Sequence, residues 1–135
     1  MKTPEEIVAE MMQQDAFSKW LGIELIHISR GYCVLQLSVN SEMLNGFEIL
    51  HGGISYSLSD SALAFAANSY GNKCVSIETS ISHLKPVPPK EILKAVANEL
   101  HRGKSLAVYE VSIFNARDEK ISLFKGTVHI SKEIW

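Results

Sequence analysis

One short stretch in the middle of the sequence carries residues whose types and spacing could do chemistry. It consists of His51, Gly52 and Gly53, followed seven residues after Gly53 by Asp60. A glycine pair before a long run without Gly or Pro is typical of a helix start, where backbone N–H groups lack internal partners and partial positive charge collects. Because glycine has no Cβ, a ligand carbonyl can approach these amides closely. This pattern predicts an oxyanion site at the helix start.

Asp60 lies within a segment that is predicted to be a buried helix. Apolar residues occur on most faces of residues 54–70, and such a helix must be covered by other elements. Burial of an ionised carboxylate costs free energy unless the group finds partners or its pKa rises. The residue types alone leave two interpretations open: a catalytic base, or a satisfied carboxylate near the helix start or at a subunit contact.

The spacing between Gly53 and Asp60 bears on how a site could be assembled. Seven residues make nearly two helical turns, so the two residues share a face and lie about 10 Å apart along the axis. An Asp side chain is too short to close that gap. One helix therefore cannot place both groups around one carbonyl, whereas two antiparallel helices related by a two-fold axis could. The spacing predicts a homodimer as the minimal unit.

The rest of the chain predicts the elements that must hold this helix. Helical patterns cover residues 3–14, with Thr3 as N-cap and Pro4 in the first turn, and residues 54–70, ended by Gly71. Period-two alternation and turn signals predict strands over residues 32–39, 76–84, 92–100, 106–115 and 121–131. We expect a single domain over 1–135 of α+β class, with a curved antiparallel sheet of about five strands around the long helix.

Composition excludes several classes of function. A formal net charge of -2 provides no basic footprint for nucleic acid. Glutamates interrupt the first ten residues, so no signal peptide is expected, and the polar residues of 54–70 make it a poor membrane span. Cys33 and Cys74 lie far apart without metal-ligand spacing, which is typical of buried thiols in a reducing compartment. We expect a cytoplasmic protein without metal or other cofactor.

Several motifs together resemble a known family. They are Met43-Leu44-Asn45-Gly46, His51-Gly52-Gly53, Ser57-Leu58-Ser59-Asp60, Ala64 to Gly71, Leu84-Lys85-Pro86, Gly103-Lys104 with Val108-Tyr109, and Leu123-Phe124-Lys125-Gly126. Over most of its length the chain is similar to the hotdog-fold acyl-CoA thioesterases, and within them to the phenylacetic acid degradation protein PaaI group. The resemblance implies hydrolysis of an acyl-CoA, with phenylacetyl or hydroxylated aryl-acyl groups as candidate substrates. It also implies a homotetramer built from two dimers.

The resemblance assigns roles at four matching positions. Asp60 matches the catalytic carboxylate, acting either as general base on water or as a nucleophile that forms a mixed anhydride. Gly53 matches the residue whose backbone N–H polarises the thioester carbonyl, and Asn45 matches a polar residue that holds the thioester or the attacking water. Ser76 matches a hydroxyl near the carboxylate. In the triplet, His51 is interpreted as structural rather than as the base.

Other positions leave alternatives open. The expected substrate-binding residues are His51, Gly52, Arg102 and Lys104. The last two lie in a turn between predicted strands, and this turn either contacts the phosphates of coenzyme A or is simply solvated. A hotdog hydratase commonly places His four residues after Asp, but Ala64 stands there, which disfavours enoyl-CoA hydration. A non-catalytic acyl-CoA-binding module remains the alternative from another class of function.

Overall fold

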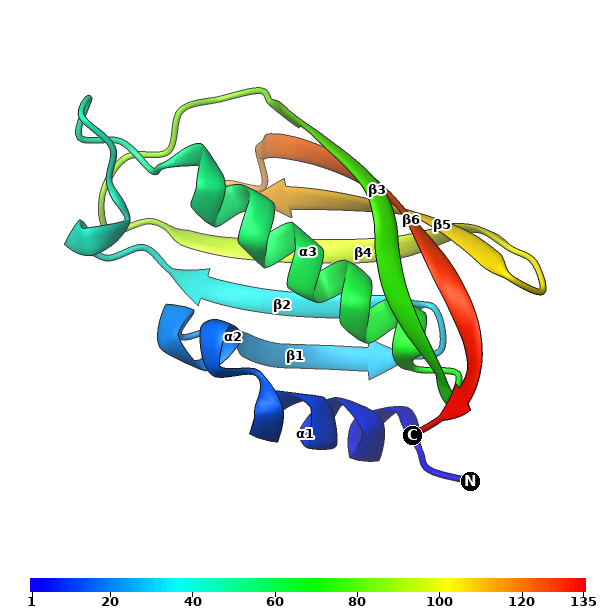
Figure 1. The fold of residues 1–135 in the computed structure, drawn as a ribbon. Coiled ribbons are helices and arrows are strands. Elements are labelled where there is room, and N and C mark those ends of the chain that lie inside the picture. The colour runs from blue at the N-terminus through cyan, green and yellow to red at the C-terminus, as the bar shows by residue number, and fades with distance from the viewer.

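A curved antiparallel sheet wraps around one long helix in the computed structural model, which describes residues 1–135 (Figure 1). The central helix is α3 (Gly52–Asn68), and two shorter helices, α1 (Pro4–Gln14) and α2 (Ala16–Leu21), come before the sheet. The strands are β1 (Glu24–Ser29), β2 (Tyr32–Ser38), β3 (Asn72–His83), β4 (Ile92–Arg102), β5 (Leu106–Phe114) and β6 (Lys120–Ile134). Their order across the sheet is β1-β2-β4-β5-β6-β3. The predicted α+β class, curved sheet, central helix and N-terminal helix are confirmed.

The sheet has one strand more than the sequence predicts. The missed strand is β1, in which only Ile28 is buried, so its sequence shows no clean alternation between two faces. Its pairing with β2 also shifts between Leu25 and His27, which leaves Ile26 as an extra residue. A bulge of this kind breaks the period of two that identifies a strand.

The N-terminal helices form a corner beside β1 (Figure 1). In α1 the predicted cap is confirmed, because the Thr3 hydroxyl accepts the Glu6 N–H at 3.2 Å and the Glu6 carboxylate accepts the Thr3 N–H at 2.9 Å. The second helix, α2, is not predicted. Asp15 caps its start, and Gly22 ends it in the left-handed conformation at φ 76°.

Helix α3 packs against the concave face of the sheet, and this contact sets how closely the helix approaches the strands. Leu58, Ala62 and Phe65 are almost completely buried. On the facing strand β6, a Cβ at Gly126 would lie 2.7 Å from Leu63 Cδ2, so the absence of a side chain there allows the sheet to approach the helix closely. The helix is therefore held rigidly along the length that carries the predicted site.

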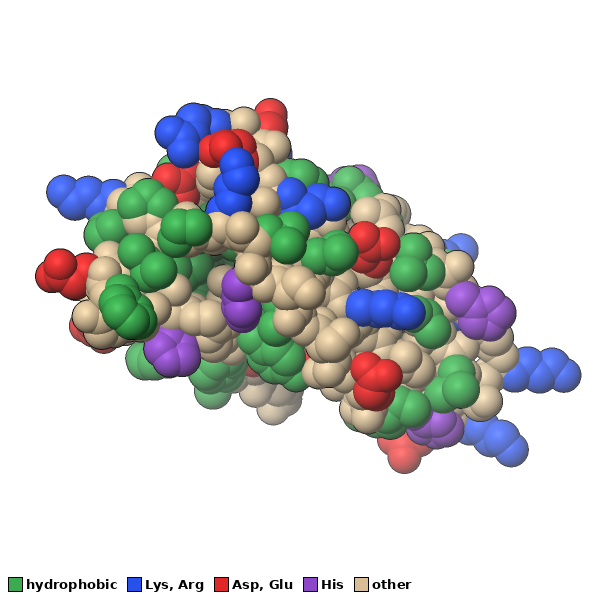
Figure 2. All heavy atoms as spheres, turned by 90° about the horizontal axis from the view of Figure 1, so that it is seen from above, with side chains coloured by type: hydrophobic (Ala, Val, Ile, Leu, Met, Phe, Trp, Pro, Cys, Tyr) green, Lys and Arg blue, Asp and Glu red, His purple; other side chains and the backbone are tan.

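Strand β3 forms an edge of the sheet, with its outer side unpaired. Two of its apolar side chains are open to solvent, Val75 at 63% and Ile77 at 58% exposure. Figure 2 shows apolar side chains interspersed with charges of both signs on the face seen from above. None of the helices combines the length and apolar character that a membrane crossing requires.

Candidate active site

The start of α3 leaves one backbone donor free, and it belongs to Gly52. His51 is the N-cap residue, and its Nδ1 atom accepts the N–H of Gly53 at 2.8 Å. The N–H of Ile54 donates to the carbonyl of His51 at 3.0 Å. The N–H of Gly52 has no partner within the chain. The Gly53 N–H, which is predicted to polarise the thioester carbonyl, is thus occupied by His51 within this chain, and His51 caps the helix.

Gly52 opens into a cavity of about 350 Å³, the helix-start cavity. The residues that line it are Asn45, Ile49, Leu50, Gly52, Ser55, His83, Leu84, Lys85, Pro86, Val87 and Ile121. They come from the loop before α3, from its first turn, and from the segment that follows β3. The structure therefore brings the predicted residues Asn45 and Gly52 together.

Asn45 is oriented by the loop that it closes. Its Oδ1 atom accepts the backbone N–H of Phe47 at 2.9 Å and that of Ile49 at 3.4 Å. The Asn45 backbone also pairs with Ile49, through an N–H to carbonyl bond of 2.8 Å. With its oxygen engaged in this way, the side-chain NH₂ group has no partner within the chain. The cavity thus contains two free N–H donors, one from Gly52 and one from Asn45, and such donors stabilise a developing oxyanion.

Asp60 lines a second cavity of about 250 Å³, the Asp60 cavity. Its lining residues are Asp60, Leu63, Ala64, Cys74, Val75, Ser76 and Val128. The pKa of Asp60 is raised, mainly because burial disfavours the ionised carboxylate, and secondly because the negative charge of Asp15 is near. No hydrogen bond from this chain reaches the carboxylate. A partly desolvated carboxylate of this kind is suited to act as a base.

The predicted residue Ser76 lies in the same cavity as Asp60, as the resemblance implies. The two cavities have no lining residue in common. A single chain therefore keeps the N–H donors of the helix start apart from the carboxylate in the middle of the helix.

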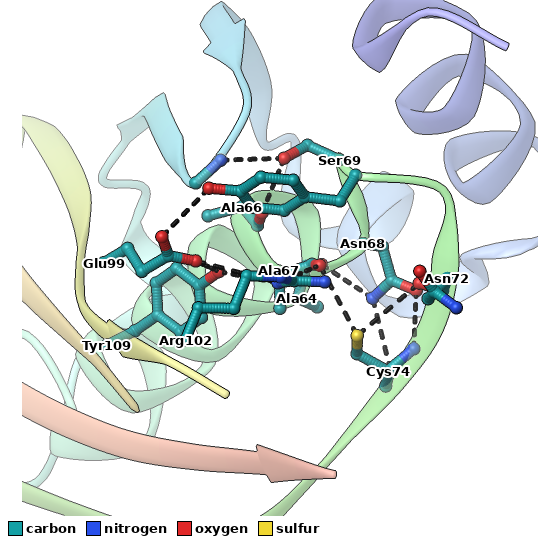
Figure 3. Close-up of polar contacts among 12 residues, drawn as sticks. Ala64, Ala66, Ala67, Asn68, Ser69, Asn72, Cys74, Glu99, Arg102 and Tyr109 are labelled. Carbon is teal, nitrogen blue, oxygen red and sulfur yellow. Dashed lines mark hydrogen bonds and ion pairs between the residues drawn. The ribbon is translucent and has the colours of Figure 1, made fainter. Parts of the chain in front are cut away.

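Arg102 lies in neither cavity, because it is part of an internal network at the end of α3 (Figure 3). Its guanidinium lies 3.8 Å from the centre of the Tyr70 ring and 3.7 Å from Glu99 Oε1. It also donates to the carbonyl of Ala67, near the negative end of the helix, at 3.4 Å. Its side chain is only 17% exposed. Arg102 is therefore neither free to meet coenzyme A phosphates nor simply solvated, the two alternatives that the sequence leaves open, and we assign it to the packing of α3.

Lys104, the other predicted phosphate contact, is exposed in the turn between β4 and β5 and also lines neither cavity. The lysine beside the helix-start cavity is Lys85, which forms an ion pair with Glu119. Hydrogen bonds to the Glu119 carboxylate, first from Lys85 and then from Asn115 and Arg117, lower the pKa of Glu119 to about 2. Lys85 is thus the lysine that the structure places beside the free N–H groups.

His83 is a residue of the helix-start cavity that sequence reasoning missed. A Cβ on Gly52 would lie 2.9 Å from His83 Nε2, so the imidazole lies directly against the glycine. No sequence spacing links His83 to the His51-Gly52-Gly53 triplet, so residue types and spacing do not single it out. Its place follows from the path of β3, which ends at His83 next to the helix start (Figure 1).

Comparisons with known proteins give independent information on the family. A model described as the thioesterase superfamily matches residues 47–122. Acyl-coenzyme A thioesterase PaaI of Escherichia coli (strain K12) is 38% identical over 119 residues, covering 88% of this chain and 85% of that protein. Acyl-coenzyme A thioesterase 13 of Homo sapiens is 29% identical over 129 residues, covering 93% of this chain and 92% of that protein.

A solved structure gives the same result for the fold. The structure of the E. coli PaaI protein matches with a TM-score of 0.95 and 34% identity, covering 97% of this chain and 95% of that chain. The hotdog architecture expected from the resemblance is therefore confirmed.

Proposed function

Because this chain belongs to the thioesterase superfamily, we propose that it hydrolyses acyl-CoA thioesters to the free acid and coenzyme A. One observation carries the proposal. Free N–H donors from Gly52 and Asn45 line one cavity, and a carboxylate of raised pKa, Asp60, lines the other. Together they would supply the two functions that thioester hydrolysis requires, an oxyanion site and a base.

The reaction would proceed by attack of water on a polarised carbonyl. The Gly52 N–H and the Asn45 amide would hold the thioester oxygen and stabilise the negative charge that develops on it. Asp60 would take a proton from water as the water oxygen bonds to the carbonyl carbon. The carbon–sulfur bond then breaks, and coenzyme A leaves as a thiolate that takes up the proton Asp60 removed from water, which returns Asp60 to its ionised form.

Direct attack by Asp60 on the carbonyl is the alternative route, through a mixed anhydride. Single turnover in ¹⁸O water distinguishes the two routes. In the general-base route the label enters the product acid. In the nucleophilic route water attacks the Asp60 carbonyl of the anhydride, the product acid leaves with an oxygen that came from Asp60, and the label is found first in the Asp60 carboxylate.

The catalytic unit would be a homodimer, because one chain separates the two halves of the site. The exposed edge of β3 offers unpaired backbone groups together with Val75 and Ile77, and edges of this kind are normally covered. Pairing of β3 with a second copy would extend the sheet and place two α3 helices side by side. Asp60 of one copy could then face the donors of the other, and two such dimers could form a tetramer.

The Asp60 cavity would take the acyl group. Leu63, Ala64 and Val128 give it apolar walls, and its volume of about 250 Å³ suits a compact group such as phenylacetyl or a hydroxylated aryl-acyl group. Coenzyme A would extend from the helix-start cavity past Lys85, whose ammonium can serve as a point charge for phosphate. Single-domain organisation over 1–135 and a cytoplasmic location belong to the same proposal.

A panel of acyl-CoA substrates tests this function. We expect thiol release from the wild-type protein, with a kcat of roughly 1 s⁻¹ or more on its preferred substrate. Aryl-acetyl groups should be preferred over long acyl chains, which exceed the cavity. Tight binding of acyl-CoA without any release of thiol would instead establish a non-catalytic binding module and contradict the proposal.

A further inference from the structure

The corner between α1 and α2 holds a second carboxylate in a fixed position. Asp15, the N-cap residue of α2, accepts two hydrogen bonds from Ser18, one from its N–H at 2.9 Å and one from its hydroxyl at 2.7 Å. Ser18 itself is almost fully buried, at 1% exposure. The Asp15 carboxylate is therefore anchored from inside the protein and cannot swing freely into solvent.

The same serine connects this corner to the central helix. The hydroxyl oxygens of Ser18 and Ser61 lie 2.9 Å apart, and Ser61 directly follows Asp60 in α3. A hydroxyl has a single proton, and that of Ser18 is donated to Asp15, so Ser61 must donate to Ser18. The order Ser61, Ser18, Asp15 forms a hydrogen-bonded chain that ends on a carboxylate beside the turn that carries Asp60.

Three elements surround Asp60. The N-terminal corner contributes the charged Asp15, strand β3 contributes the titratable thiol of Cys74, and β6 contributes the apolar Val128. Burial raises the pKa of the Cys74 thiol, so that group is neutral beside Asp60. The pKa of Asp60 is raised by burial first and by Asp15 second, and no positive charge is among the causes. Asp15 is thus the charged group that acts on Asp60 within the chain.

Taking the proposed function as given, we propose that Asp15 is a positioning residue for thioester hydrolysis: its anchored negative charge, linked through Ser18 and Ser61 to the turn that carries Asp60, favours proton transfer from water to Asp60. A nearby negative charge makes the transfer of a proton to Asp60 more favourable. Proton abstraction from water becomes faster as the base becomes stronger. Asp15 acts through Asp60 and through the hydrogen-bonded serines, without touching the substrate.

Asp15→Asn separates this role from capping, because Asn is as good an N-cap as Asp and its oxygen can still accept the Ser18 N–H. We expect kcat/KM at neutral pH to fall about two- to five-fold. We also expect the acid limb of the pH profile to move to lower pH, since activity requires the ionised carboxylate and the pKa of Asp60 should decrease. A structural role alone would lower the activity without moving this limb.

Glu5→Gln is the matched control, because it removes one negative charge from the exposed first turn of α1. Its profile should coincide with that of the wild type. If Asp15→Asn folds poorly in circular dichroism, Asp15→Ser removes the charge and retains a capping oxygen. An unchanged acid limb in both Asp15 variants would overturn the proposal.

A carboxyl NMR titration of Asp60 keeps this proposal distinct from the proposed function. It compares the wild type with Asp15→Asn and needs no substrate. A lower Asp60 pKa in the variant supports the role of Asp15 even if no acyl-CoA is hydrolysed. An unchanged Asp60 pKa refutes that role even if hydrolysis is fast.

Discussion

Replacing Asp60 with Asn is expected to lower kcat for acyl-CoA hydrolysis by about 10³-fold, because the amide can neither accept a proton from water nor attack the carbonyl. KM should change little, since the donors of the helix-start cavity and Lys85 remain in place. Thiol release on the preferred substrate measures kcat, and calorimetric titration with coenzyme A measures binding. The two measurements together separate loss of chemistry from loss of binding.

The same variant should be at least as stable as the wild type at neutral pH. The pKa of Asp60 is raised in the folded protein, so the ionised side chain costs folding free energy at pH values above that pKa. This cost disappears below the ordinary pKa of an aspartate, where the group is protonated in both states. We expect a gain of at most about 1 kcal/mol, because the side chain is only partly buried. The gain should be absent at low pH.

Asp118→Asn provides a control with the same chemical change. Asp118 lies in the exposed turn before β6 at φ 60°, a conformation that Asn also tolerates, and it lines neither cavity. Its activity should equal that of the wild type. Equal activity of Asp60→Asn and wild type would remove Asp60 from the mechanism.

Replacing Asn45 with Asp is expected to lower kcat/KM by about 10²- to 10³-fold. The Oδ1 atom of Asp can still accept the N–H groups of Phe47 and Ile49, so the loop should keep its shape. The change removes the free NH₂ donor and puts a negative charge where the thioester oxygen becomes an oxyanion. Steady-state kinetics of thiol release measure the loss.

The matched control is Asn40→Asp, because Asn40 caps the 3-10 turn Ser41–Met43 that comes before the Asn45 loop. Asn40 Oδ1 also holds a turn, by accepting the Glu42 N–H at 3.0 Å, but the residue lies outside both cavities. Asp is an equally good N-cap there, so activity should be retained. A similar loss in both variants would show that the effect of Asn45→Asp comes from a disturbed loop.

Much of the fold could be predicted because its signals are local. The cap at Thr3, the glycines before α3 and the alternation in β2, β4, β5 and β6 depend on residues close in sequence. Strand β1 escaped prediction because a bulge at Ile26 interrupts its period. Helix α2 escaped because six residues are too few to show a helical period, although Asp15 and Gly22 mark its two ends.

The sequence singles out residues that line two cavities of the structure, but not the details of the candidate site. Asn45 lines the helix-start cavity, and Asp60 and Ser76 line the Asp60 cavity. The free donor is Gly52 rather than Gly53, because the choice depends on the side-chain orientation of His51, which sequence spacing does not encode. The contacts of Arg102 escape prediction for a related reason. Its partners Ala67 and Tyr70 lie at or just beyond the end of α3 and reach it only because β4 packs beside that helix end.

Mixed assemblies of the two inactive variants test most directly whether each active site is shared between two chains. Asp60→Asn and Asn45→Asp chains with different affinity tags are produced together, and assemblies that contain both are isolated by sequential purification. If Asp60 of one chain works with Asn45 of another, a mixed dimer has one site with both changes and one intact site. Thiol release should then recover to about half the wild-type rate per dimer. If each site instead lies within one chain, every site in the mixed dimer carries one of the two changes. Thiol release no faster than that of the single variants would therefore contradict a site shared between two chains.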